Sequence, residues 1–380
     1  MNLAALFALA LLNPASQPSP QAASPTAAVT PVNGHIIVST RGDSALVLID
    51  PVSFRAYGRL EAPVGLHEIA ASPDGRRAIG SAYGSGPRHQ TPDQRLLVIN
   101  LPDNNPATDD AMTLGALIDL GTANVRPNDL AFFPDNRHVL CTSEVAQTVL
   151  KIDVDAAGEG GQDAAPDYEA TPSGPTAPPP AAAGTAPVPI VETYSFGARA
   201  GHMLAVSRDF TRCYVPSVAD QTVSVIDLTT GEVLAAPIAG QGAEGIAAAP
   251  DNSAVWIACN RGESIAILDP ATNTIAHTFA SAGFPLRLRF TPDSAFVVVS
   301  YPVANQVRVF DAATRELVKT FGFPPDSAPT SIAVSPDGRL LAVVCAGIEA
   351  VAILDLRTGQ ILSHNSVGPV PDGLAWAPAQ

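Results

Sequence analysis

The chain has 380 residues, of which 46% are hydrophobic and 15% charged, and its 29 glycines and 36 prolines favour short strands joined by turns over long helices. Its formal net charge of −15 lacks the basic footprint that binding to a phosphate backbone requires, and it opposes binding to an anionic membrane surface. We therefore expect no nucleic-acid partner.

Residues 1–30 are predicted to be a leader that precedes the folded domain. An apolar run from Leu3 to Leu12 is followed by a stretch rich in Pro, Ser and Ala, which is typical of a secretory signal peptide and spacer. No Lys or Arg precedes the run, which leaves a disordered tail as the alternative. The run is too short to span a bilayer, so we expect a periplasmic or secreted protein that is not transmembrane.

A turn signature recurs along the rest of the chain. Pro sets φ, Asp can bond its own turn, and Gly or Asn tolerates the left-handed conformation that follows. Copies lie at residues 72–75, 133–136, 249–252, 291–294 and 335–338, with degenerate copies at 207–209 and 377–378. Measured at the Pro or its equivalent, the intervals are 61, 74, 42, 42, 44 and 42 residues.

Each turn lies between two apolar strands, and a third strand ends in a hydrophobic residue followed by Asp, as at Ile226-Asp227. A fourth, weaker strand follows a short turn such as Thr230-Gly231. Four antiparallel strands per repeat predict a propeller blade. Because the Asp recurs in nearly every repeat, we expect it to cap a turn and not to be catalytic.

The two ends of the chain predict how the ring closes. Pro378 lies two residues from the C-terminus, and a step of 42 residues back from Pro73 reaches Pro31. The C-terminal segment is therefore expected to be the innermost strand of a blade whose other strands come from the N-terminus. The predicted fold is all-β, a seven-bladed β-propeller of four-stranded antiparallel blades that forms one domain over residues 31–380.

Two intervals between the turns are longer than 42 residues. The first carries extra residues at 84–94 and 103–113, and the second carries a run rich in Ala, Pro and Gly at 155–189 that we expect to be a disordered loop. Tyr83, Arg88 and His89 of the first insertion should overhang one mouth of the channel, either as a lid or as a filler. The four cysteines are spread widely with no CxxC or CxxCH, so there is no haem motif, and we expect buried free thiols.

The unit of apolar strand, Ser-Pro-Asp-Gly, apolar strand, Val-x-Val-Ile-Asp and Thr-Gly resembles the YVTN-type propeller repeats of bacterial and archaeal surface-layer and periplasmic proteins. Cys213-Tyr214-Val215-Pro216-Ser217 lies where the name-giving motif of that family falls. The resemblance covers residues 31–380 and implies the fold. Proteins of this general shape include exported binding proteins, large subunits of amine dehydrogenases, lactone hydrolases and a streptogramin lyase, so the fold does not choose a function.

The innermost strands begin six residues before each turn Pro, at the channel mouth, where a ligand would meet the propeller. The seven positions are Asp372, His67, Asn128, His202, Glu244, Leu286 and Thr330. Five consecutive blades thus present polar side chains, which indicates either a solvated funnel or a site. As a site, His67, His202, Glu244 and Asp372 would hold a divalent cation, His67 and His202 would be catalytic, and Asn128 would contact the ligand.

One repeat departs from its siblings inside the channel. Three residues before the turn Pro, six repeats carry Ala and one carries Arg289, with Arg287 two residues earlier. Either arginine could pair with an acid of another blade or bind an anionic group of a ligand. The loops between the second and third strands add Arg41, Glu144, Ser217, Asn260, Arg261 and Tyr301, of which Arg261 and Tyr301 are predicted ligand contacts.

Three functions remain open from the sequence. The first is an exported, monomeric binding or scaffold propeller that uses the channel face for a protein, a glycan or a small ligand. The second is a metal-assisted hydrolase or lyase of the lactonase type, in which an arginine holds an anionic substrate. The third, drawn from the resemblance, is an accessory large subunit of a periplasmic complex similar to an amine dehydrogenase, whose cofactor would lie on a partner.

Overall fold

The computed structural model describes residues 34–85, 91–103, 111–123, 126–156 and 190–380, which belong to one compact unit, Val32–Gln380. The predicted leader, the insertion residues Arg88 and His89, and most of the predicted loop (157–189) lie outside the described residues. Across the ranges just given, no helix is long and apolar enough to cross a membrane.

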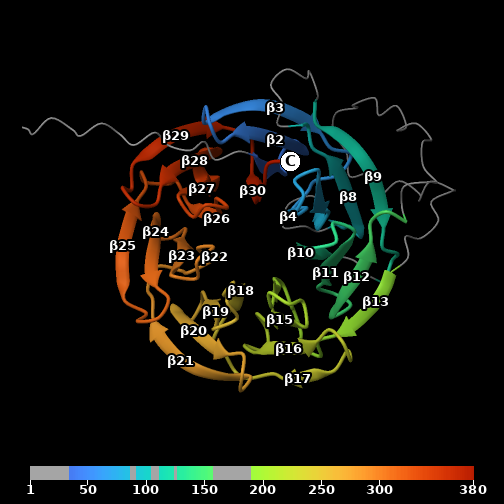
Figure 1. Cartoon of the computed structure of the whole chain (residues 1–380), viewed down its shortest axis with the longest axis vertical. Coiled ribbons are helices and arrows are strands. Elements are labelled where there is room, and N and C mark those ends of the chain that lie inside the picture. Colours follow the sequence, from blue (N-terminus) through green and yellow to red (C-terminus); the bar gives the residue numbers. More distant parts are fainter. Residues whose placement is uncertain (1–33, 86–90, 104–110, 124–125, 157–189) are drawn as a thin grey trace, which may run out of the picture. The chain divides into compact units, whose positions relative to one another are not determined.

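Seven four-stranded antiparallel sheets are arranged in a ring around a central channel, as the repeat predicted (Figure 1). The innermost strands are β4(Ile69–Ala71), β10(Pro127–Phe132), β14(Ala205–Val206), β18(Ala243–Ala248), β22(Leu288–Phe290), β26(Pro329–Val334) and β30(Pro371–Ala377). The second strands are β1(His35–Thr40), β5(Arg77–Ser81), β11(His138–Ser143), β15(Arg212–Pro216), β19(Val255–Cys259), β23(Phe296–Tyr301) and β27(Leu340–Cys345).

The remaining strands complete the blades outward. The third strands are β2(Ala45–Asp50), β8(Arg95–Asn100), β12(Thr148–Asp153), β16(Val223–Asp227), β20(Ser264–Asp269), β24(Gln306–Asp311) and β28(Ala350–Asp355). The outer strands are β3(Arg55–Glu61), β9(Thr113–Asp119), β13(Ile190–Ser195), β17(Val233–Ala235), β21(Thr274–Ala280), β25(Leu317–Gly322) and β29(Ile361–Ser366). Two short strands, β6(Gly84–Ser85) and β7(Thr91–Pro92), pair within the first insertion, and a 3-10 helix, η2(Ala346–Ile348), follows β27.

The ring closes as the ends of the chain predicted. Strand β30 pairs with β1, with Ile37 opposite Ala375 and Val38 opposite Leu374, so the sheet order is β3-β2-β1-β30. The first and last parts of this unit therefore share one blade, and the inner edge of β1 is not left unpaired.

The recurring turn is held by its own side chains. Ser335 donates from Oγ to Asp337 at 2.5 Å and accepts the amide of Leu340 at 2.8 Å, while Gly338 takes a φ of +73°. The last position of the turn also joins neighbouring blades, because Asn136 Oδ1 accepts the amide of Asp74 at 2.9 Å. Asp269, after a third strand, accepts the amide of Ala271 at 2.8 Å, which confirms the predicted capping role.

Burial follows the order of strands within a blade. Every residue of β1, β19 and β27 is buried, whereas the outer strands are largely exposed. Trp256 is fully buried between blades, with the rings of Phe279 at 5.7 Å and Phe290 and Phe310 at 6.2 Å. All four cysteines lie in second strands as buried free thiols, as predicted.

Candidate functional site

His67 and Asp372 lie together at the channel mouth, although 305 residues separate them. His67 lies two residues before β4, and Asp372 belongs to β30 of the adjacent blade. The imidazole bonds through Nδ1 to the Asp372 carboxylate, and Arg41 Nε lies 2.9 Å from the same carboxylate oxygen.

The charges of this pair are coupled. Burial opposes protonation of His67, but the attraction of Asp372 and its hydrogen bond outweigh burial and raise the pKa of the imidazole. Burial likewise opposes ionisation of Asp372, yet the charge of His67 and the hydrogen bond from it, together with Arg41, lower the pKa of this carboxyl to about 2. Each side chain therefore stabilises the charged form of the other.

His202 comes from the blade of β14 and contacts side chains of the neighbouring blade of β10. Asn128 Nδ2 lies 3.0 Å from Nδ1 and 3.2 Å from Nε2 of the imidazole, and Glu144 Oε2 lies 3.5 Å from Nδ1. Tyr83 donates its hydroxyl to Glu144. Burial opposes ionisation of Glu144, but hydrogen bonds from His202 and Tyr83 lower the pKa of the carboxyl.

Ring contacts join these two parts of the site. The Tyr83 ring lies 5.0 Å from the His67 ring and 5.9 Å from the His202 ring, and the two imidazoles are 6.0 Å apart. The Arg126 guanidinium lies 5.4 Å from the centre of the Tyr83 ring. The first insertion thus contributes Tyr83 directly to the mouth.

Glu244 continues the arc on the far side of His202, with Oε1 at 3.9 Å from Nε2 of the imidazole. Asn260 donates from Nδ2 to Glu244 at 2.5 Å, and Arg287 Nη1 lies 3.4 Å from Oε1. Burial opposes ionisation of Glu244, but Arg287 and then His202 lower the pKa of its carboxyl. We call the following side chains the mouth network: His67, Tyr83, Asn128, Glu144, His202, Glu244 and Asp372.

The predicted arc from Asp372 to Glu244 is thus brought together, while Leu286 and Thr330 of the other two blades make no side-chain bond to it. In the ranges that the structure describes, no three His, Cys, Asp or Glu side chains are arranged to hold a metal ion. His67 and Asp372 are bonded to each other, and Glu244 is bonded to Asn260 and Arg287. The four predicted metal ligands therefore contact protein partners, and the divalent cation stays a prediction.

The predicted ligand contacts divide into different environments. Tyr301 is fully buried, shares a hydrogen bond of 2.5 Å with Ser281, and has the Arg308 guanidinium 4.0 Å from its ring centre. Its hydroxyl is thus engaged inside the protein, and its role as a ligand contact stays a prediction. Arg287 is also buried and bonded to carboxylates, whereas Arg261 is exposed.

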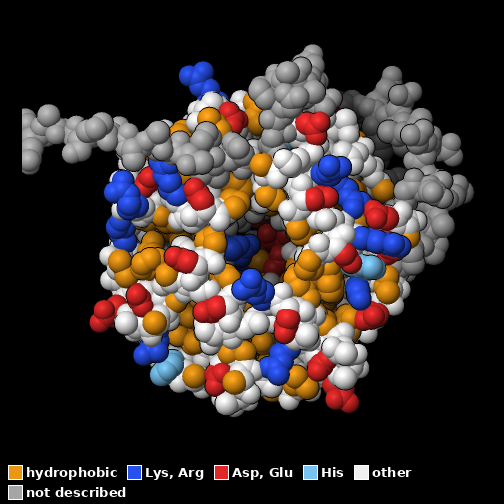
Figure 2. Space-filling model, viewed as in Figure 1, with side chains coloured by type: hydrophobic (Ala, Val, Ile, Leu, Met, Phe, Trp, Pro, Cys, Tyr) orange, Lys and Arg blue, Asp and Glu red, His pale blue; other side chains and the backbone are white. Residues whose placement is uncertain are grey.

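Two channel residues were missed in the sequence, Glu68 and Asp129. Each follows a residue of the predicted arc, and both are buried. The alignment of the repeats could have identified them. The position after the arc residue is Gly373, Met203, Gly245 and Ser331 in four other blades and Arg287 in the fifth. Charged side chains at a position otherwise held by small or apolar residues indicate a polar channel interior. On the face shown in Figure 2, the central opening contains both basic and acidic side chains.

Comparison with known proteins supports the fold and leaves the function open. No family model matches the chain, and no curated protein matches its sequence. A functionally unknown protein from Desulfotomaculum acetoxidans superposes with a TM-score of 0.67 at 13% identity, over 92% of this chain and 100% of that one. Hydrazine synthase from Kuenenia stuttgartiensis superposes with a TM-score of 0.63 at 16% identity, over 84% of this chain and 92% of that one. At such identities the likeness shows the propeller fold alone.

Proposed function

We propose that this protein is an exported binding propeller of the YVTN-repeat type whose mouth network takes a neutral, hydroxyl-rich ligand such as the end of a glycan. The observation that carries the proposal is the set of hydrogen-bonding groups that meet at the mouth from five consecutive blades. The amide oxygens of Asn128 and Asn260 are buried there and accept no hydrogen bond from the described residues. Ligand hydroxyl groups would supply the donors that these oxygens require.

The charges around the mouth favour a neutral ligand over an ion. The carboxylates of Glu68, Glu144, Glu244 and Asp372 lie within 4 Å of guanidinium groups of Arg41, Arg126 and Arg287, and Asp372 also bonds to His67. With most of these charges already paired, an ionic ligand would have to displace a protein partner. A neutral ligand would use the remaining donor and acceptor capacity without such a cost.

The export part of this proposal rests on the apolar run in residues 1–30. Expression of the full chain in a bacterial host, followed by mass measurement of the periplasmic fraction, tests it. A periplasmic protein shortened at its N-terminus is the expected result, and an unprocessed protein retained in the cytoplasm would contradict export.

A screen of mono- and oligosaccharides by thermal shift and calorimetry tests the ligand class. His202→Ala should weaken the binding of any retained sugar by about tenfold or more, because the variant loses one hydrogen-bonding ring at the centre of the network. His277→Ala, on the exposed face of β21, is the matched control and should leave the affinity unchanged. Equal affinities in wild type and His202→Ala would overturn the assignment of the site.

The His67–Asp372 bond favours a second candidate, a hydrolase or lyase. A carboxylate that holds an imidazole is the arrangement that orients a general base. Assays with a panel of lactones test it, with Asp372→Asn as the variant that leaves the imidazole but removes its partner. Turnover that falls at least about a hundredfold in Asp372→Asn would support catalysis, and absence of turnover by the wild type across the panel would exclude lactone hydrolysis.

A further inference from the structure

A pocket lined by residues outside the mouth network lies along the inner strands. It has a volume of about 350 Å³ and is bounded by β10, β14, β18 and β22. Its lining includes Pro250 of a recurring turn, whereas Glu244, six residues earlier, belongs to the mouth. The lining also includes Asp129, which directly follows Asn128 of the mouth network.

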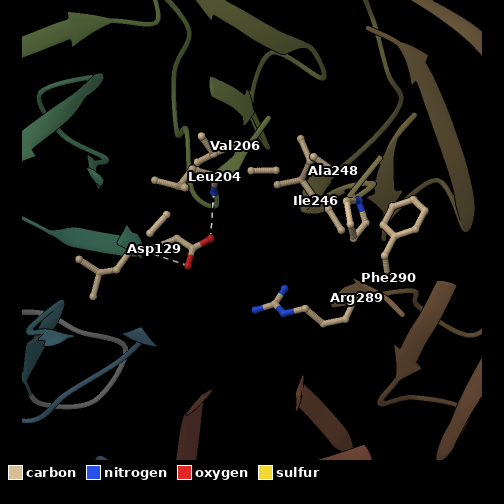
Figure 3. A pocket seen from close by; sticks show the side chains of 12 residues that line it. Asp129, Leu204, Val206, Ile246, Ala248, Arg289 and Phe290 are labelled. Atoms are coloured by element: carbon tan, nitrogen blue, oxygen red, sulfur yellow. Dashed lines mark hydrogen bonds between the residues drawn. The ribbon is translucent and has the colours of Figure 1, made fainter. Parts of the chain in front are cut away.

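Two opposite charges face each other across this pocket (Figure 3). The Asp129 carboxylate comes from β10, where its oxygens accept the amides of Leu130 at 2.9 Å and Leu204 at 3.0 Å. Arg289 comes from β22, and its Nη1 donates to the carbonyl of Leu288 at 2.9 Å. Within the described residues Arg289 makes no ion pair, so its other N–H groups are available to a ligand in the pocket.

The walls between the two charges are apolar and small. Ala205, Ile246 and Ala247 line the pocket, and Phe290 closes the side next to Arg289. The position of Arg289 is Ala in the other six blades, so the guanidinium is not a requirement of the blade. A volume of this size lies near the lower end of the range for small-molecule sites.

We propose that this pocket binds a small organic carboxylate with an ammonium or hydroxyl group at its other end. The carboxylate pairs with Arg289, the donor group faces Asp129, and the carbon chain lies against the apolar wall. An arginine binds a carboxylate through two parallel hydrogen bonds, which gives this end its specificity. Burial and the nearby charge of Glu68 raise the pKa of Asp129. A ligand cation would favour the ionised form of this carboxyl and so offset both effects.

The site uses side chains that are not in the mouth network, and its Asp129 shares one register position with the buried Arg287–Glu68 pair. Calorimetry with ω-amino carboxylates of increasing chain length tests it, alongside alkyl carboxylates and alkylamines of matched length. At least one amino carboxylate should bind at millimolar concentration or tighter and should bind more tightly than both matched controls.

Arg289→Ala is the decisive variant, since it installs the residue of the six sibling blades and should fold normally. It should weaken binding at least about tenfold, whereas Arg261→Ala, exposed on a mouth loop, should not change it. Asp129→Asn should abolish the preference for the amino carboxylate over the alkyl carboxylate. Equal binding by wild type and Arg289→Ala, or no binding by any member of the series, would overturn the proposal.

Discussion

Arg287 Nη2 lies 2.6 Å from Glu68 Oε1, and the two residues come from the inner ends of blades that are not neighbours in the ring. Their side chains are only 7% and 5% exposed. The pair therefore crosses the channel and links the residue before β22 to the residue before β4, while Nη1 of the same guanidinium reaches Glu244 at 3.4 Å. This contact places a buried charge pair across the channel at the register position of Asp129.

Removal of one charge of this pair should destabilise the propeller. Glu68→Gln removes the nearest negative charge from a buried guanidinium, so we expect a loss of about 3 kcal/mol in the free energy of unfolding, at the lower end for a broken buried pair. Urea denaturation at neutral pH measures it.

The matched control for Glu68→Gln is Asp220→Asn, which breaks the exposed pair with Arg199 and should cause no measurable change. Equal effects of the two substitutions would show that the crossing pair does not contribute as described.

The stability contributed by His67 and Asp372 should depend on pH in a defined direction. The pKa of folded His67 is raised above 6.5, so its contribution is complete below about pH 6.5 and is lost as the pH rises through the higher folded value. The pKa of Asp372 is lowered from 3.8 to about 2, so its contribution is present above about pH 3.8 and is lost as the pH falls toward 2.

The difference in thermal midpoint between wild type and Asp372→Asn should therefore be largest between these limits and shrink at alkaline pH. His277→Ala, at an exposed position, should show a small difference that does not vary in this way. A difference that grows from neutral to alkaline pH would contradict the pairing.

The four buried thiols should be unreactive in the folded protein. Burial raises the pKa of Cys259 to about 11 and of Cys345 to about 12, and it also raises that of Cys141 and Cys213. A thiol reagent should modify none of them in native buffer and all four in denaturant. Rapid native modification, or fewer than four reactive thiols after unfolding without reductant, would contradict this state.

The shared blade should be necessary for a closed ring. Deletion of residues 371–380 removes β30, so the inner edge of β1 loses its partner and the unit opens. We expect a larger hydrodynamic radius and loss of the cooperative unfolding transition, measured by size-exclusion chromatography and near-UV circular dichroism. Deletion of Gln380 alone is the control and should preserve both.

The fold could be predicted because its information is local and repeated. The Ser-Pro-Asp-Gly turns and the Asp after each third strand make hydrogen bonds within a few residues, so each copy reports the same structure. The polar arc was predictable for the same reason, since the register places His67 beside Asp372.

The bonding partners of these side chains could not be predicted from the sequence in the same way. The link from Arg287 to Glu68 spans 219 residues and depends on reach across the channel, which register does not specify. Tyr301 has the same register as residues of the mouth loops, but its ring turns into the blade to meet Ser281. Side-chain direction at such positions is decided by packing between blades.

The most direct test of the proposed mouth site is nuclear magnetic resonance of imidazole-labelled histidines during titration with a sugar retained by the screen. The resonances of His67 and His202 should shift with one common dissociation constant, because both rings lie in the mouth network. Those of His277 and His364, on exposed outer strands, should stay unchanged. Saturable binding that leaves His67 and His202 unshifted would contradict the assignment of the ligand to the channel mouth.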